Sequence, residues 1–177
     1  MKRFVKAMAL VIALLCVFTA FVACTAEQGD NEKNNSADVE FYITYKGVKV
    51  ELDKKADSVI SALGTPKKTE SLGTCSGRGA EIKYVYDDIV IHTLKSDNDE
   101  TIDQISFTND IAETKKGICI GDSSDKVIKA YGDPAEKTDS LIIYTKALDG
   151  FKLYLKFGIE NGEVDKINFI RLFDVEE

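Results

Sequence analysis

The sequence predicts an α+β fold of two tandem repeats, each a short helix packed on a small antiparallel sheet. The phrase VISALGTP at residues 59–66 returns as VIKAYGDP at residues 127–134, and an offset of 68 keeps the apolar, glycine and proline positions aligned. Each phrase is followed by three runs that have the pattern of half-buried strands. We therefore expect repeat 1 over residues 41–112 and repeat 2 over residues 113–177.

Residues 1–23 have the composition of a bacterial export signal, in which three basic residues precede an apolar run. A membrane-spanning helix is the alternative, but it needs about 20 apolar residues, and this run is shorter. The run ends in FVAC at residues 21–24. This ending resembles the lipobox of bacterial lipoproteins, which implies a lipoprotein signal peptide and a lipid on Cys24. Ordinary cleavage after Ala26 is the competing interpretation.

Residues 24–40 are predicted to form a flexible tether, because they are rich in Asn, Asp and Glu and almost lack large apolar residues. The whole chain has a net charge of −7, and removal of the three basic residues of the signal makes it −10. Binding of nucleic acid depends on Lys and Arg that neutralise phosphates, so we expect no nucleic-acid partner. The lipid on Cys24 would make the membrane a partner, with the protein on the extracytoplasmic face of the cell membrane.

The two repeated phrases have the pattern of short amphipathic helices. Three apolar residues of each phrase share one helix face: Val59, Ile60 and Leu63 in the first, and Val127, Ile128 and Tyr131 in the second. Asp122 or Ser123 can cap the start of the second helix, and Asp53 is the nearest equivalent in the first. Gly132 and Pro134 are typical of a helix end, so the phrase is a structural signal.

Strand patterns surround both helices. A strand pair is expected within FYITYKGVKVEL at residues 41–52. Further strands are expected at residues 82–86, 89–94 and 101–108 of the first repeat, and at residues 141–145, 151–157 and 164–170 of the second. In FKLYLKF at residues 151–157, alternation places Lys152, Tyr154 and Lys156 on one side and the apolar residues on the other.

The stretch GICIGDSSDKVIKAYGDP, followed by three strands, resembles a known helix-and-sheet repeat. That repeat occurs in the β-lactamase inhibitor protein and in the small lipoprotein subunit of the outer-membrane β-barrel assembly machine. The stretch is also similar to uncharacterised tandem-repeat lipoproteins of Gram-positive bacteria. The resemblance implies a β-lactamase inhibitor protein-like fold that binds protein partners through the exposed face of its sheet. It supplies no catalytic residue.

Four tyrosines in the strand-like runs are the candidate binding residues: Tyr84, Tyr86, Tyr144 and Tyr154. Tyrosine gives a large contact area at small entropic cost, so we expect some of them to line a recognition surface. Half-buried packing within the sheet is the alternative.

The sequence predicts a lipid-anchored binding module that presents its sheet to a protein or to a cell-envelope polymer. We expect no enzyme, cofactor or metal site, because His92 is the only histidine and no motif of catalysis accompanies it. The alternative function is an extracytoplasmic thiol, redox or metal-binding protein that uses Cys75 and Cys119. Whether these two cysteines form a disulfide is left open by the sequence.

Overall fold

The computed structural model describes residues 39–73 and 79–173. The predicted signal peptide, Cys24 and Cys75 lie outside this part of the chain, as does most of the predicted tether. Neither helix within the described ranges has the length and apolar character needed to cross a membrane.

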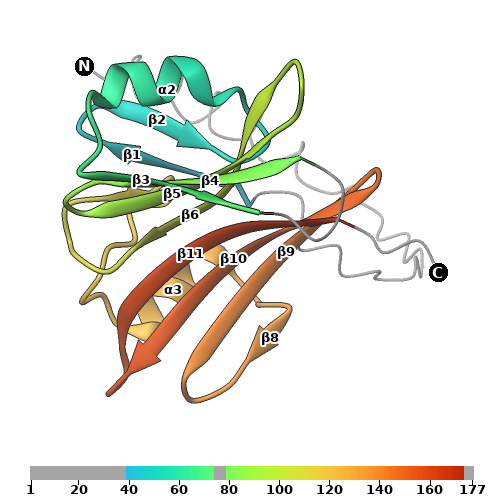
Figure 1. Cartoon of the computed structure of the whole chain (residues 1–177). Helices are drawn as coiled ribbons and strands as arrows, with labels where there is room; N and C mark the ends of the chain where they lie inside the picture. Colours follow the sequence, from blue (N-terminus) through green and yellow to red (C-terminus); the bar gives the residue numbers. More distant parts are fainter. Residues whose placement is uncertain (1–38, 74–78, 174–177) are drawn as a thin grey trace, which may run out of the picture. The chain divides into compact units, whose positions relative to one another are not determined.

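The described residues form two antiparallel sheets and two helices (Figure 1). The larger sheet has eight strands in the order β3 (Lys68–Leu72), β4 (Ala80–Val85), β5 (Ile89–Lys95), β6 (Glu100–Phe107), β11 (Glu163–Phe173), β10 (Phe151–Glu160), β9 (Leu141–Leu148) and β8 (Glu136–Lys137). The smaller sheet has three strands in the order β2 (Val48–Glu51), β1 (Tyr42–Tyr45) and β7 (Glu113–Thr114). The helices are α2 (Ala56–Leu63) and α3 (Ser124–Tyr131).

The predicted fold of two α+β repeats is wrong, because the protein is mostly β. Strands hold 53% of the described residues and helices hold 12%. The strands expected to form two small sheets make one continuous sheet, in which residues 104–107 of β6 pair with residues 167–170 of β11. This pairing satisfies backbone groups that would otherwise remain open at two sheet edges. Residues 42–51 form a sheet of their own with β7, which the sequence pattern did not predict.

The predicted signals at the ends of α3 are confirmed. The Ser123 side chain accepts a hydrogen bond from the Lys126 backbone N–H, and Gly132 follows the helix with φ of 79°. The expected cap at Asp53 is wrong, because α2 begins without a side-chain cap. Asp53 instead has φ of 61° and directs its carboxylate to Arg171.

The hydrophobic core lies against one face of the large sheet, which we call the inner face. Strand register gives a transverse row on this face: Tyr84, Ile91, Ile105, Phe169, Leu155 and Tyr144. Val59 of α2 and Val127 of α3 belong to the same core cluster, and Figure 1 shows α3 behind β10 and β11. Val127 is fully buried, whereas Ile128 packs against the cluster while partly exposed.

Arg171 lies where β6 and β11 stop pairing, and its side chain is 5% exposed. Its Nε donates to Asp103 Oδ1 at 2.9 Å, its Nη2 donates to Thr101 Oγ1 at 2.9 Å, and its Nη1 donates to the Asp53 carboxylate. The guanidinium carbon lies 4.7 Å from the centroid of the Phe173 ring. Burial raises the pKa of the Asp103 carboxyl, although Arg171 acts in the opposite direction. The network joins the β2–α2 turn to two strands of the large sheet.

Candidate functional site

The face of the large sheet opposite the core, which we call the outer face, is the candidate binding surface. Successive residues of a strand point to opposite faces of the sheet, so the residues next to those of the inner row form a second row on the outer face. Register gives this outer row as Glu70, Lys83, His92, Gln104, Ile170, Tyr154 and Thr145. None of these side chains belongs to the described core cluster.

Strands β10 and β11 contribute a group of cationic side chains to the outer face. Lys152, Tyr154 and Lys156 alternate along β10, and Lys166 of β11 lies opposite Gly158. We call these four residues the lysine–tyrosine surface. The ammonium of Lys156 lies 5.1 Å from the centroid of the Tyr154 ring, which is a cation–π distance. Lys152 and Lys156 are about 13 Å apart along the strand at the usual rise per residue.

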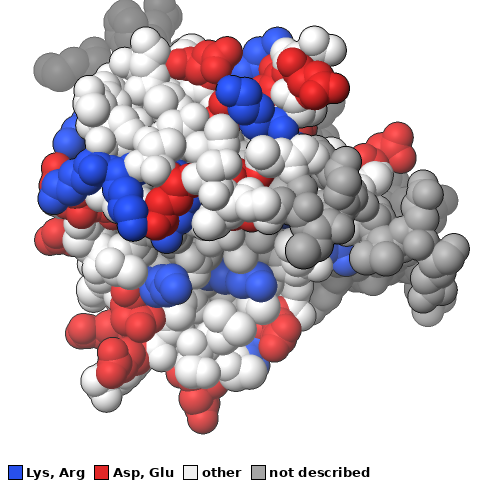
Figure 2. Space-filling view, in the orientation of Figure 1, with Lys and Arg blue, Asp and Glu red and all other residues white. Residues whose placement is uncertain are grey.

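The lysine–tyrosine surface carries unbalanced positive charge. Its three lysines form no ion pair with any described carboxylate. One carboxylate reaches the outer side of β9 to β11 between the strand ends: Asp165, the extra residue of the bulge in β11, lies beside Gly158 and Lys166 and leaves the three lysines in excess. In Figure 2, blue side chains lie among white atoms over the lower strands, with red atoms at the margins. This contrasts with the net charge of −7 of the whole chain.

Strands β3 to β5 differ, because their outer charges are paired. Lys68 and Lys83 lie 2.5 Å and 3.4 Å from the Glu70 carboxylate oxygens. The hydrogen bond from Lys68 lowers the pKa of Glu70. His92 Nδ1 lies 2.5 Å from Glu81 Oε1. The positive potential is therefore confined to the β10–β11 half of the outer face.

The structure does not bring the four candidate tyrosines together on one surface. Tyr84, Tyr86 and Tyr144 point to the inner face, while Tyr154 points to the outer face. Tyr86 donates to the Gly64 carbonyl at 3.3 Å, and Tyr144 donates to the Gly132 carbonyl at 2.9 Å. Both hydroxyls therefore bind the glycine that follows a helix.

The remaining inner tyrosine, Tyr84, donates to Glu100 Oε1 at 2.8 Å. Thr93 donates to the same Glu100 oxygen at 2.6 Å. The Glu100 side chain is largely buried. Burial raises the pKa of Tyr84 above its usual value, and raises the pKa of Tyr144 to about 12. The three inner tyrosines therefore pack against the core, and their hydroxyls bind other groups of the fold. This arrangement matches the alternative in which the tyrosines pack within the sheet.

The lysines of the candidate surface were not predicted from the sequence as binding residues, although the sequence pattern already indicated where two of them point. The alternation in FKLYLKF already placed Lys152, Tyr154 and Lys156 on one side of a strand. Their lack of partner carboxylates depends on which strands flank β10, and this is a property of the sheet order. Lys166 joins the group only through its register opposite Gly158.

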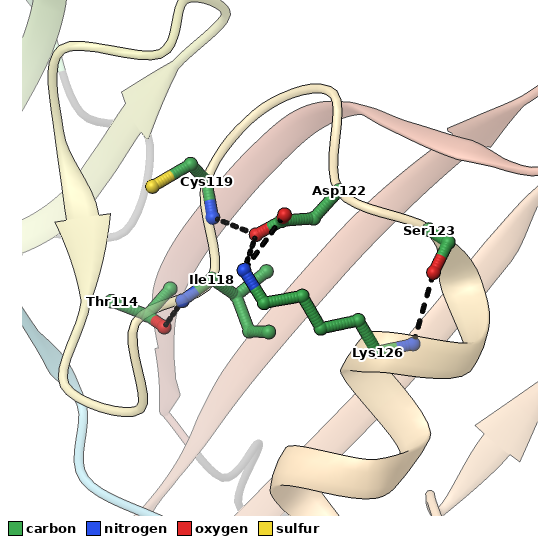
Figure 3. A network of polar contacts seen from close by, with 6 residues as sticks. All are labelled: Thr114, Ile118, Cys119, Asp122, Ser123 and Lys126. Carbon is green, nitrogen blue, oxygen red and sulfur yellow. Dashed lines mark hydrogen bonds and ion pairs between the residues drawn. The ribbon is translucent and has the colours of Figure 1, made fainter.

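Cys119 lies in a polar network just before α3 (Figure 3). Its backbone N–H donates to Asp122 Oδ2 at 2.8 Å, and Lys126 Nζ donates to both oxygens of the same carboxylate. The Ile118 N–H donates to Thr114 Oγ1 at 3.1 Å. These contacts organise the turn that leads into the helix.

The environment of Cys119 disfavours the thiol chemistry of the alternative function. The thiol is free, and burial together with the Asp122 charge raises its pKa. At neutral pH it therefore remains protonated, whereas the thiolate is the nucleophile and metal ligand. Cys75 lies outside the described residues. Within residues 39–73 and 79–173 no group of His, Cys, Asp and Glu side chains could hold a metal ion.

Comparison with known proteins gives one match. A family model described as a domain of unknown function (DUF7738) matches residues 39–156. Neither the curated proteins nor the solved structures gave a match. The matched range begins at the first described residue and ends within β10, so it includes Lys152, Tyr154 and Lys156. The chain therefore belongs to the DUF7738 family.

Proposed function

We propose that this protein is a lipid-anchored binding module of the extracytoplasmic membrane face, and that its lysine–tyrosine surface binds an acidic segment of a protein partner. The observation that carries the proposal is the excess of Lys152, Lys156 and Lys166 over the one carboxylate beside them, in a chain that is acidic as a whole. Such a local positive field attracts a negatively charged partner and orients it during encounter. The acidic remainder of the protein repels the same partner, which restricts binding to this face.

The side chains between the lysines favour a protein over a purely charged polymer. Tyr154 lies between Lys152 and Lys156, and its register neighbours are Ile170 and Thr145. Leu172 follows on the same face and is 48% exposed. Aromatic and apolar groups of this kind gain contact energy from the side chains of a protein interface. A cell-envelope polymer is the competing partner, and it would use mainly the charges.

Neutralising the lysines is expected to weaken binding of an acidic peptide by about tenfold to a hundredfold, because each exposed charge pair contributes up to about 1 kcal/mol. The triple variant Lys152→Gln, Lys156→Gln and Lys166→Gln would be titrated with a fluorescent 20-residue polyglutamate. Fluorescence polarisation of the full chain in a neutral detergent at low salt measures the dissociation constant.

The matched control for this titration is Lys68→Gln with Lys83→Gln, which removes lysines already paired with Glu70. An equal loss of affinity in the control would contradict the assignment to β10 and β11. Polyphosphate serves as the competing probe. Tighter, lysine-dependent binding of polyphosphate that does not respond to Tyr154→Ala would contradict the protein partner in favour of a phosphate-bearing polymer.

The proposed anchor is tested separately. Cys24→Ala is expected to abolish metabolic labelling by an alkyne fatty-acid analogue and to release the protein from the membrane fraction, because the mature chain would lack its lipid. Cys16→Ala is the matched control, since Cys16 belongs to the predicted signal and its loss should leave labelling unchanged. Undiminished labelling of the Cys24→Ala variant would overturn the anchor.

A further inference from the structure

A groove of about 230 Å³ lies between residues 39–42 and the β9–β10 hairpin. One wall is formed by residues of β1 and β2 and their flanking segments, among them Phe41 and Leu52. The other wall is formed by Lys146, Leu148 and Leu153. The groove is separate from the lysine–tyrosine surface, because Lys146 and Leu153 are register partners that share the inner side of the sheet.

The carboxylates of the groove are already engaged by cations. Glu40 lies 3.6 Å from Lys115 Nζ, and Glu51 lies 2.7 Å from Lys49 Nζ. Asp53 binds Arg171. None of these three cations is among the residues that line the groove. Each of these three carboxylates therefore has a cation beside it before a ligand arrives, although Asp53 shares Arg171 with Asp103.

The two lysines that line the groove are not engaged in this way. Lys54 and Lys146 form no ion pair with a carboxylate in the described part of the chain. A cation without a partner next to balanced carboxylates leaves a net positive site, which favours an anionic group. The outer face has lysines without ion pairs too, but Lys54 and Lys146 are not among them, so the positive charge of the groove is separate.

Apolar side chains complete the groove. Phe41, Leu52 and Leu153 form buried parts of its walls, while Leu148 is 40% exposed at its edge. Pockets for drug-sized ligands usually have about 300–1,000 Å³, so this groove suits a smaller molecule. Together the lysines and the leucines provide an anionic subsite beside an apolar one.

We infer that the groove binds a small anionic amphiphile, that is, a carboxylate or phosphate head group with a short apolar chain. The head group lies at Lys54 and Lys146, and the chain lies along Leu148 and Leu153. This site is independent of the proposed function, because it shares no residue with the lysine–tyrosine surface.

Hexanoate is the first probe, with the full chain in a neutral detergent and the detergent alone as blank. Methyl resonances of Leu52, Leu148 and Leu153 are expected to shift saturably with hexanoate. Acetate lacks the chain and hexanol lacks the charge, so each is expected to bind at least about tenfold more weakly, as the loss of one charge-assisted contact or of the apolar contact predicts. Hexyl phosphate distinguishes a phosphate head group from a carboxylate.

Lys54→Gln with Lys146→Gln is expected to weaken hexanoate binding about tenfold, while the outer-face pair Lys152→Gln with Lys156→Gln leaves it unchanged. Equal binding of hexanol and hexanoate to the parent protein overturns the inference, and so does an equal loss in the outer-face control. The ligand series on the parent decides the question even if the groove variant fails to fold. Loss of polyglutamate binding in the outer-face variant with intact hexanoate binding separates this site from the proposed function.

Discussion

Replacing Arg171 by Met is expected to lower the free energy of unfolding by about 3 kcal/mol. The substitution keeps most of the apolar length of the side chain but leaves the Asp53 and Asp103 carboxylates without their cation. Removal of one partner from a buried ion pair usually costs about 3–5 kcal/mol. We expect the lower end of this range, because the Asp53 and Asp103 side chains are 40% and 26% exposed and keep some contact with water. Urea denaturation of parent and variant measures the difference.

The loss caused by Arg171→Met should depend on pH in a defined direction. The pKa of Asp103 is already raised by burial in the parent, and removal of Arg171 removes an influence that lowers it. A carboxyl with a raised folded pKa contributes most to stability at acid pH, and this contribution is lost as pH rises through the folded pKa. The difference between parent and variant should therefore be largest at neutral pH and decrease as Asp103 becomes protonated.

Lys126→Met is the matched control for this experiment. Lys126 is 51% exposed on its side chain and binds Asp122 in an (i, i+4) pair at the surface. Loss of such a pair should cost less than about 1 kcal/mol. If Arg171→Met costs no more than Lys126→Met, the Arg171 network does not hold the β2–α2 turn against the sheet.

Phe157→Ala is expected to destabilise the protein by about 3–5 kcal/mol, because it leaves a cavity among buried rings. Phe157 is fully buried, and its ring centroid lies 5.6 Å from that of Tyr131 and 6.2 Å from that of Tyr144. Tyr154→Ala, three residues earlier on β10, should move the unfolding midpoint little, since Tyr154 lies on the outer face. Chemical denaturation of the two variants compares the faces of one strand.

This pair of variants also tests the basis of the candidate surface. Tyr154→Ala should reduce polyglutamate affinity, whereas a folded variant of an inner-face residue should not. A large stability loss in Tyr154→Ala, equal to that of Phe157→Ala, would mean that Tyr154 packs in the core and does not face a partner.

The sequence by itself determined those features that depend on neighbouring residues. The cap at Ser123 and the end of α3 at Gly132 were predicted because each requires one residue type at one position of a helix. The faces of β10 were predicted because alternation along a strand fixes which side chains point together. These features include three of the four residues of the candidate surface, namely Lys152, Tyr154 and Lys156.

Only the tertiary structure decided the fold class and the charge balance of the sites. The pairing of β6 with β11 joins strands that the sequence pattern placed in separate sheets, since register between distant strands leaves no local signal. Arg171 and Asp53 are 118 residues apart in the chain, and Arg171 and Asp103 are 68 apart. Whether a lysine has a carboxylate beside it depends on the strands that fold next to it. The unbalanced lysines of both proposed sites therefore became visible only when long-range strand pairing had set their neighbours.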